Sequence, residues 1–347
     1  MMRSLARYAT ANAVTRTMLS EFLTKQEFDA INRTASLQEA WAALRRTRHG
    51  DWLPQDSPTD VLALEQLLRE ATALRFKRSI RTLKGKPKEV GTTLLSRWDL
   101  DNLEFALRLW HGRDSSLVGS VAQVSFVHEI PSIQIAGAQT IEEIALALRH
   151  TPYFEPVSAS VATYREKHSI FYVEVTLERD YYRRLLQTVR ALGGHEALEG
   201  ERIIASEIDL LNLSWVGRLL QYYGIRAAEL HQFLIPSPSV ISRQLTSPGL
   251  TADALNEIGS KFFAEAFRRD GKRLSTLERV SLLEYMVSEM AVQAARRSLA
   301  GYPFSITCIL SFYLLKRVEL RNLTTSFVGK ASGLTETEIS RRLYGLR

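Results

Sequence analysis

The chain has 347 residues, and at about 150 residues per domain this length predicts two or three domains. Apolar residues make up 45% and charged residues 24%, which is typical of soluble globular proteins and argues against a disordered or fibrous chain. The formal net charge of +7 favours acidic partners or an anionic surface, but the basic residues form short clusters separated by acidic helical segments.

No stretch of the sequence predicts a membrane-spanning helix. The longest candidate, residues 306–315, is only about half of the ~18 consecutive apolar residues that such a helix needs. The N-terminus has no uninterrupted apolar segment and no cleavage site of the secretory kind. Cys308 is the single cysteine, so an intrachain disulfide is excluded, and we expect it to be a small buried side chain in a cytoplasmic protein.

The first part of the chain has a helical pattern. Ser36 is followed by an acidic first turn, which predicts a helix start. Apolar residues then recur at helical spacing from residue 61 until Gly85 and Pro87 interrupt the pattern. We interpret residues 85–92 as an exposed basic loop between helices, because the spacing of its glycines is not that of a phosphate-binding loop.

The same kind of pattern recurs twice further along the chain. Thr140 begins a segment similar to the one at Ser36, and helical spacing follows over residues 177–192 and 274–299. Strand patterning is scarce. Its best cases are residues 118–126 and 169–175, so we expect a mainly helical chain with at most a minor irregular hairpin.

One short motif occurs three times, an acidic residue followed by Leu, any residue, Asn and Leu. Its copies begin at residues 99, 209 and 319, so successive copies are 110 residues apart. An acidic residue and an asparagine three positions apart share one face of a helix and can together hydrogen-bond to a neighbouring segment. Because the pair recurs in every copy, we interpret it as structural rather than catalytic. The residues that define the repeat are Asp99, Asn102, Leu103, Asp209, Asn212, Leu213, Glu319, Asn322 and Leu323.

The repeat predicts an all-α fold of three similar helical domains of about 110 residues. Proline-containing segments at 130–131 and 235–239 suggest the boundaries, which gives units 1–130, 131–240 and 241–347. Neighbouring units would cover one another's apolar faces, either around a pseudo-threefold axis or as a short solenoid.

The sequence carries no signature of catalysis, of cofactor binding or of metal binding. It contains no phosphate-loop motif, no dinucleotide-binding glycine fingerprint and no zinc-binding His-Glu-x-x-His helix. The seven histidines are scattered, and their spacing makes no metal site. We therefore expect no catalytic residue, no cofactor, no metal and no small-molecule substrate.

Four segments resemble the family of C subunits of archaeal and bacterial A/V-type rotary ATPases, whose eukaryotic relative is the d subunit of the V-ATPase. They are residues 8–16, 178–182, 209–213 and the tail 313–334, and their order along the chain makes the resemblance specific. The resemblance implies a funnel of three similar helical domains around a pseudo-threefold axis. Gly217 departs from the family's pattern, which has a bulkier helical residue there.

The resemblance also implies a non-catalytic rotor part of the central stalk. Members of the family sit on the ring of membrane proteolipids and receive the end of the central shaft in their cavity, transmitting torque for ATP-coupled ion transport, including proton transport. The expected partners are therefore the proteolipid ring and the central shaft subunits, with no nucleic acid. The expected location is the cytoplasmic side of the membrane, as a peripheral part of the ATPase complex.

Other functions stay open from the residues alone. A nucleic-acid-binding helical protein would suit a sequence pI near 9.5, and it predicts a continuous basic stripe and binding that weakens steeply with salt. An enzyme that uses some of the carboxylates would need a pocket with strongly shifted groups. A basic helical scaffold needs neither feature.

Overall fold

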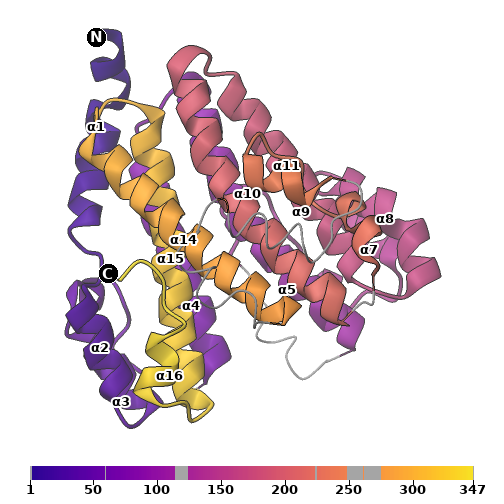
Figure 1. Ribbon diagram of the computed structural model, residues 1–347, viewed down its shortest axis with the longest axis horizontal. Helices are drawn as coiled ribbons and strands as arrows, with labels where there is room; N and C mark the ends of the chain where they lie inside the picture. The colour runs from indigo at the N-terminus through magenta and orange to yellow at the C-terminus, as the bar shows by residue number, and fades with distance from the viewer. Residues whose placement is uncertain are drawn as a thin grey trace.

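The computed structural model describes residues 2–58, 60–113, 124–222, 225–247, 261 and 275–346. Every regular element in these residues is helical, so the expected all-α class is confirmed (Figure 1). The division at residues 130 and 240 and the pseudo-threefold axis stay predictions.

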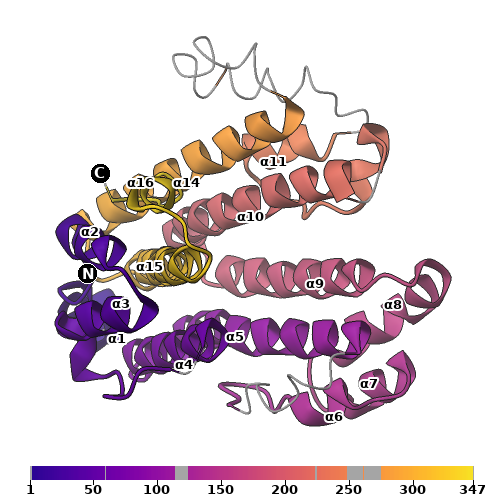
Figure 2. The same ribbon diagram turned by 90° about the horizontal axis from the view of Figure 1, so that it is seen from below.

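Three pairs of long helices form the body of the molecule. The two helices of each pair pack against each other, and α5 also packs on α9, α10 on α14, and α15 on α4, so the contacts return to the first pair. Figure 2 shows α14, α10, α9 and α5 one beneath the other. The pairs are α4 (Val61–Ile80) with α5 (Gly85–Gly112), α9 (Phe171–Arg190) with α10 (Gly194–Tyr222), and α14 (Thr276–Ala300) with α15 (Ile306–Ala331).

Short helices cover the second helix of each pair. In the described residues α6 packs on α5, α11 packs on α10, and α15 is covered by α16 together with α2 and α3 from the start of the chain. The shorter elements are α1 (Met2–Leu19), α2 (Lys25–Arg33), α3 (Leu37–Arg45), η1 (Arg48–Asp51), α6 (Ser132–Ala136), α7 (Ile141–Ala147), α8 (Phe154–Lys167), η3 (Ala227–Gln232), α11 (Val240–Leu245) and α16 (Glu336–Ser340).

The helix starts predicted at Ser36 and Thr140 are confirmed. The Ser36 side chain accepts a hydrogen bond from the backbone N–H of Glu39, and Thr140 does the same for Glu143. Each hydroxyl thereby satisfies one of the N–H groups that a first helical turn leaves without an intrahelical acceptor.

The prediction of a basic loop at residues 85–92 is wrong, because these residues form the first turns of α5. Pro87 lies in the first turn, where its missing N–H leaves no intrahelical hydrogen bond unmade, so proline does not prevent a helix there. Val90 and Gly91 are already buried, whereas Lys86, at the very start of the helix, is exposed.

The strand suggested at residues 169–175 is also wrong, because α9 begins at Phe171. Phe171, Val173 and Val175 are all buried, since α9 packs against α5, α8 and α10. A helix that is buried on several sides has no single apolar stripe, and its sequence can then mimic the alternation of a strand. In the other suggested strand, residues 118–123 lie outside the described residues, and 124–126 are not in a strand.

The apolar interior consists mainly of one large cluster and one smaller one. The large cluster joins the long helices through contacts between aromatic rings, and the Trp98 ring meets the Tyr313 ring edge-on at a centroid distance of 5.6 Å. The smaller cluster joins Trp41 and Leu44 of α3 to Leu323 and Phe327 of α15. The two ends of the chain therefore share a core.

Gly217 has a packing role between α10 and α14. A Cβ atom at this position would lie 3.2 Å from Cγ1 of Val280, which is tighter than an ordinary van der Waals contact. The absence of a side chain, unexpected from the family's pattern, allows these two long helices to approach closely.

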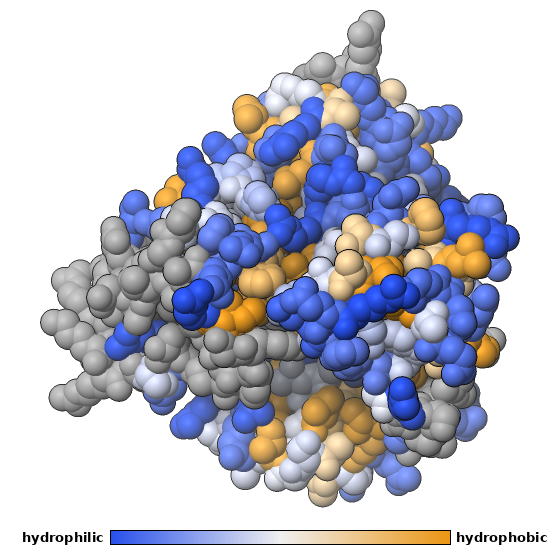
Figure 3. Space-filling view, turned by 90° about the vertical axis from the view of Figure 1, so that its right-hand side faces the viewer, coloured by the Kyte–Doolittle hydropathy of each residue, from blue (hydrophilic) through white to orange (hydrophobic). Residues whose placement is uncertain are grey.

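The surface is predominantly hydrophilic on the face shown in Figure 3, where apolar residues form small groups among polar ones. Within the described part of the chain, no helix combines the length and the apolar character needed to cross a membrane. The larger exposed apolar side chains are spread over different helices, among them Leu5, Leu74, Ile133, Leu146, Leu198 and Met290.

Candidate functional site

The three asparagines of the repeated motif each hold a backbone segment that follows 22 or 23 residues later. In the second copy the Asn212 side chain both donates to the carbonyl of Ile235, at 2.9 Å, and accepts from its N–H, at 2.8 Å. Asn322 makes the same pair of bonds with Tyr344, at 2.8 and 3.0 Å. In the first copy the bond is from Asn102 to the carbonyl of Val124, at 3.0 Å.

The acidic residue of the first copy binds the chain just before α6. Oδ1 of Asp99 accepts from the N–H of Phe126 at 2.7 Å, and Oδ2 accepts from the N–H groups of Val127 and His128, both at 2.9 Å. Burial raises the pKa of Asp99, although these three N–H donors oppose the shift.

The acidic residue of the second copy binds the start of α11. Oδ1 of Asp209 accepts from the hydroxyl groups of Ser239 and Ser242, both at 2.5 Å, and from the N–H of Ser242 at 3.1 Å. Burial again raises the pKa of the carboxyl.

The acidic residue of the third copy binds the beginning of the chain instead. Oε1 of Glu319 accepts from the N–H of Leu23 at 2.8 Å, just before α2, and Oε2 accepts from Nζ of Lys316 at 2.7 Å. Nε2 of His49 lies 3.6 Å from the same carboxylate. Burial by itself would raise the pKa of Glu319, but Lys316 and His49 lower it to about 2.

The motif leucines Leu103, Leu213 and Leu323 are buried in the core. The nine residues that define the repeat therefore do not meet at one place. Each copy instead ties its own long helix to a short segment that covers it.

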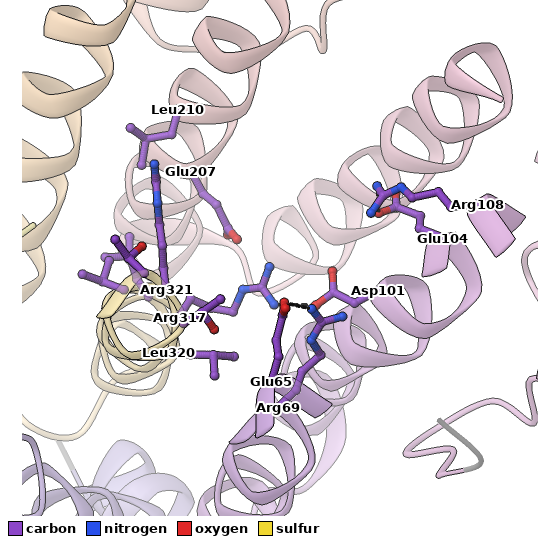
Figure 4. A pocket seen from close by; sticks show the side chains of 14 residues that line it. Glu65, Arg69, Asp101, Glu104, Arg108, Glu207, Leu210, Arg317, Leu320 and Arg321 are labelled. Carbon is purple, nitrogen blue, oxygen red and sulfur yellow. Dashed lines mark hydrogen bonds and ion pairs between the residues drawn. The ribbon is translucent and has the colours of Figure 1, made fainter. Parts of the chain in front are cut away.

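A cavity of about 500 Å³ lies between α4, α5, α10 and α15, and its charged lining was not found from the sequence (Figure 4). Acidic and basic side chains face each other across it, and Leu210 and Leu320 add apolar surface. The charged side chains are Glu65, Asp101, Glu104, Glu207, Arg69, Arg108, Arg317 and Arg321.

Asp101 joins α5 to α15 at the floor of this cavity. Its carboxylate accepts from Nη1 of Arg317 at 2.6 Å and from Nε of Arg97 at 2.9 Å. Burial would raise the pKa of Asp101, but the guanidinium groups of Arg317, Arg97 and Arg69 hold it well below its usual range. Asp101 is therefore ionised in the folded protein.

Two other carboxyls of the cavity lining have raised pKa values, opposite to Asp101. Burial, followed by the charge of Glu178, raises the pKa of Glu104 well above its usual value, although Arg97 and Arg108 oppose the shift. Burial likewise raises the pKa of Glu207. The cavity thus combines one carboxyl whose pKa is lowered with two whose pKa is raised.

Arg97, Glu207 and Arg317 occupy equivalent positions of the repeat, because each lies two residues before the acidic residue of its motif. All three are packed around the cavity or its floor. A search for identical residues misses them, since the charge changes sign in the second copy. Aligning the three copies at the 110-residue interval is the signal that finds them.

The structure places Cys308 in the core, as expected. Its sulfhydryl donates to Oδ1 of Asn12 at 3.2 Å, and burial raises the pKa of the thiol to about 11. In the described ranges, no group of three or more His, Cys, Asp or Glu side chains is placed to hold a metal ion.

These features define an all-helical protein whose polar groups brace one long helix against another around a charged cavity. Residues 11–342 match the family described as ATP synthase (C/AC39) subunit, so the chain belongs to this family. Its members are non-catalytic accessory subunits of the complex, not enzymes in their own right.

Archaeal relatives match over most of their length. The C subunit of the A-type ATP synthase of Thermococcus kodakarensis is 25% identical over 341 residues, covering 97% of this chain and 90% of the relative. The protein of the same name from Desulfurococcus is 25% identical, with 91% and 85% covered. That from Methanocaldococcus jannaschii is 21% identical, with 100% and 88% covered.

Proposed function

We propose that this chain is the subunit of an A-type ATP synthase that links the central shaft to the proteolipid ring and transmits torque between them. The observation that carries the proposal is the family match over residues 11–342, which includes all three motif copies and every cavity-lining helix. On this proposal the chain is a peripheral subunit on the cytoplasmic side of the membrane and takes part in ATP-coupled ion transport.

Torque transmission requires a body that does not flex, and the ion pairs supply cross-links between long helices. Asp101 and Arg317 connect α5 to α15, and Arg97 connects α5 to α9 through Glu178, with Nη2 and Oε1 2.7 Å apart. Removing one partner of such a buried pair leaves an uncompensated charge, so the helices are held in one arrangement.

The cavity suits the tip of a helical shaft. One turn of an α-helix with side chains, 10–12 Å across and 5.4 Å long, occupies roughly 400 to 600 Å³, which is comparable to the cavity of about 500 Å³. Because the lining carries both signs of charge, we expect a shaft end that also carries both.

Co-purification tests this function. The chain is recovered from its native membranes in mild detergent, and its companions are identified by mass spectrometry. We expect proteolipid and ATPase-head subunits in the same complex. Recovery of the chain alone, or with nucleic acid that salt removes, would contradict the proposal.

A bulky substitution in the cavity tests the shaft contact separately. Thr325 lines the cavity and is partly exposed, so Thr325→Trp fills the space without breaking an ion pair of the lining. We expect loss of the shaft and ATPase-head subunits from the purified complex while the proteolipid ring is retained. The matched control is Gln293→Trp on the exposed side of α14. Equal recovery of the shaft with both variants would show that the cavity is not its socket.

A further inference from the structure

The junction between the two ends of the chain has the same construction as the junctions inside it. Asp99 holds the backbone just before α6, and Asp209 holds the backbone at the start of α11, and each of these short helices covers the long helix that carries the acidic residue. Glu319 makes the corresponding bond to the N–H of Leu23, at the start of α2, although 296 residues separate them. The N-terminal helices thus complete the third unit.

Apolar and polar contacts both cross this terminal junction. Phe28 of α2 and Trp41 of α3 share a core with Phe327 of α15 and Ile339 of α16, and Figures 1 and 2 show α2 and α3 beside α16. At its edge, Nε of Arg33 lies 3.1 Å from Oε1 of Glu336.

At the terminal junction a buried ammonium bonds directly to the motif carboxylate. Among the described residues, the Asp99 and Asp209 carboxylates accept only from backbone N–H and hydroxyl groups, and Lys77 at the first junction donates to the carbonyl of Phe126 instead. Position 316 is Lys, whereas the equivalent positions 96 and 206 are both Ser. Lys316 is 2% exposed, and its ammonium lies 4.1 Å from the centroid of the Phe22 ring as well as against Glu319. His49, at 1% exposed, approaches Glu319 from η1 and packs its ring on Trp52.

The terminal and internal junctions also differ in the length of chain between the acidic residue and the segment that it binds. At the internal junctions the backbone that Asp99 or Asp209 binds follows 27 to 33 residues later in the chain, so a segment that separates there stays closely tethered. No peptide link of comparable length joins Leu23 to Glu319. The link runs instead through α1 and α4, which flank this segment in the chain and both pack on α15. The charged cluster adds a direct non-covalent contact between α15 and the segment itself.

We propose that Lys316, Glu319 and His49 form a latch that closes the chain end to end, and that α2 and α3 can detach from α15 as one unit when the latch is broken. Detachment removes the cover of the C-terminal half of α15 and leaves the internal junctions at Asp99 and Asp209 intact. On this proposal, breaking the latch opens the terminal junction while the rest of the molecule stays folded.

Hydrogen exchange read by mass spectrometry on the full chain tests the latch. The variant is Glu319→Gln, which keeps the size of the side chain and removes its charge, and the matched control is Asp209→Asn at an internal junction. In E319Q we expect exchange in α2, α3 and α16 to accelerate about tenfold to a hundredfold, with α5, α9 and α10 unchanged. In D209N we expect faster exchange in α10 and α11 but not in α2 and α3.

Uniform acceleration over all helices in E319Q, or unchanged protection of α2 and α3, would overturn the latch. Should E319Q not fold, Lys316→Met gives the same comparison, because it removes the ammonium that compensates the buried carboxylate. The double variant Lys316→Met with Glu319→Gln removes both charges. We expect its exchange in α2 and α3 to be slower than in Lys316→Met alone, since no uncompensated charge is left.

Discussion

An asparagine side chain is suited to its place in the repeat because its amide offers a donor and an acceptor in one plane. Asn212 and Asn322 use both groups on the same backbone residue, and so replace the hydrogen bonds that a neighbouring strand or helix would give. Aspartate cannot donate, and leucine can do neither. This explains chemically why one residue type stands at all three positions.

The three asparagines differ in how many hydrogen bonds they make and therefore in how much they stabilise the fold. Asn212 is fully buried and also donates to Oγ of Ser242 at 3.1 Å, whereas within the described part of the chain Asn102 makes one bond, to the carbonyl of Val124. We predict that Asn212→Ala lowers the free energy of unfolding by about 3 kcal/mol and Asn102→Ala by about 1 kcal/mol. Urea denaturation of the two variants checks this, and equal losses would contradict the assignment of bonds.

The acidic residues should respond to pH with opposite signs. The pKa of Glu319 is about 2 in the folded chain against an ordinary value of 4.5, so its ionised form stabilises the fold above pH 4.5 and that stability is lost as pH falls towards 2. The loss amounts to about 3 kcal/mol. We predict that E319Q is less stable than the wild type at pH 7 and that the gap narrows between pH 4.5 and 2.

Asp99 is the control for this pH dependence. Burial raises its pKa, so the wild type gains stability relative to Asp99→Asn as pH falls through the raised pKa. Urea denaturation of E319Q, Asp99→Asn and the wild type at successive pH values measures both differences in unfolding free energy. If the difference in unfolding free energy between the wild type and E319Q stayed constant down to pH 2, Lys316 and His49 would not be stabilising the charge of Glu319.

At the scale of the helices, the sequence predicts where helices begin better than it predicts which of their sides are buried. The starts at Ser36 and Thr140 are local, since a hydroxyl and the following N–H groups decide them. The error at Phe171 arises because burial on several sides of α9 is a tertiary property that no local window contains. The error at residues 85–92 arises because glycine and proline also occur in a first turn.

Close helix packing explains glycines that helix propensity would disfavour. A Cβ at Gly200 of α10 would lie 2.7 Å from Cγ1 of Val189 and 3.2 Å from Cδ1 of Leu310. Alanine is the better helix former by about 1 kcal/mol, but overpacking costs about 1–3 kcal/mol. We therefore predict that Gly200→Ala lowers the thermal midpoint. At Gly112 a Cβ would meet no atom within 4 Å among the described residues outside its own helix turn, so Gly112→Ala should not lower it, and calorimetry distinguishes the two.

At the scale of the whole molecule, the 110-residue interval predicts equivalent units but not how they meet. Nothing local in the sequence marks Leu23 as the partner of Glu319, because the partner lies at the other end of the chain. The cavity was missed for a related reason. Its equivalent positions 97, 207 and 317 differ in charge, so a motif of identical residues does not include them, and only the assembled helices show that they surround one cavity.

The ion pair between α5 and α15 should couple distant parts of the chain. Asp101→Asn leaves the guanidinium groups of Arg97 and Arg317 without a shared carboxylate, and we predict a loss of about 3 kcal/mol in the free energy of unfolding. Arg317→Gln in the same background should cost less than it does in the wild type. A double-mutant cycle by urea denaturation measures this coupling, and strictly additive losses would mean that α5 and α15 are not linked through this pair.

On the proposed function the chain lies on the rotation axis, between the shaft and the proteolipid ring, with the tip of the shaft in the charged cavity. Electron cryomicroscopy of the intact complex isolated through this chain tests this placement most directly. We expect density for a helical tip against α4, α5, α10 and α15, with the chain seated on the ring. Density for the chain away from the axis, or a cavity that stays empty while the shaft binds elsewhere, would contradict it.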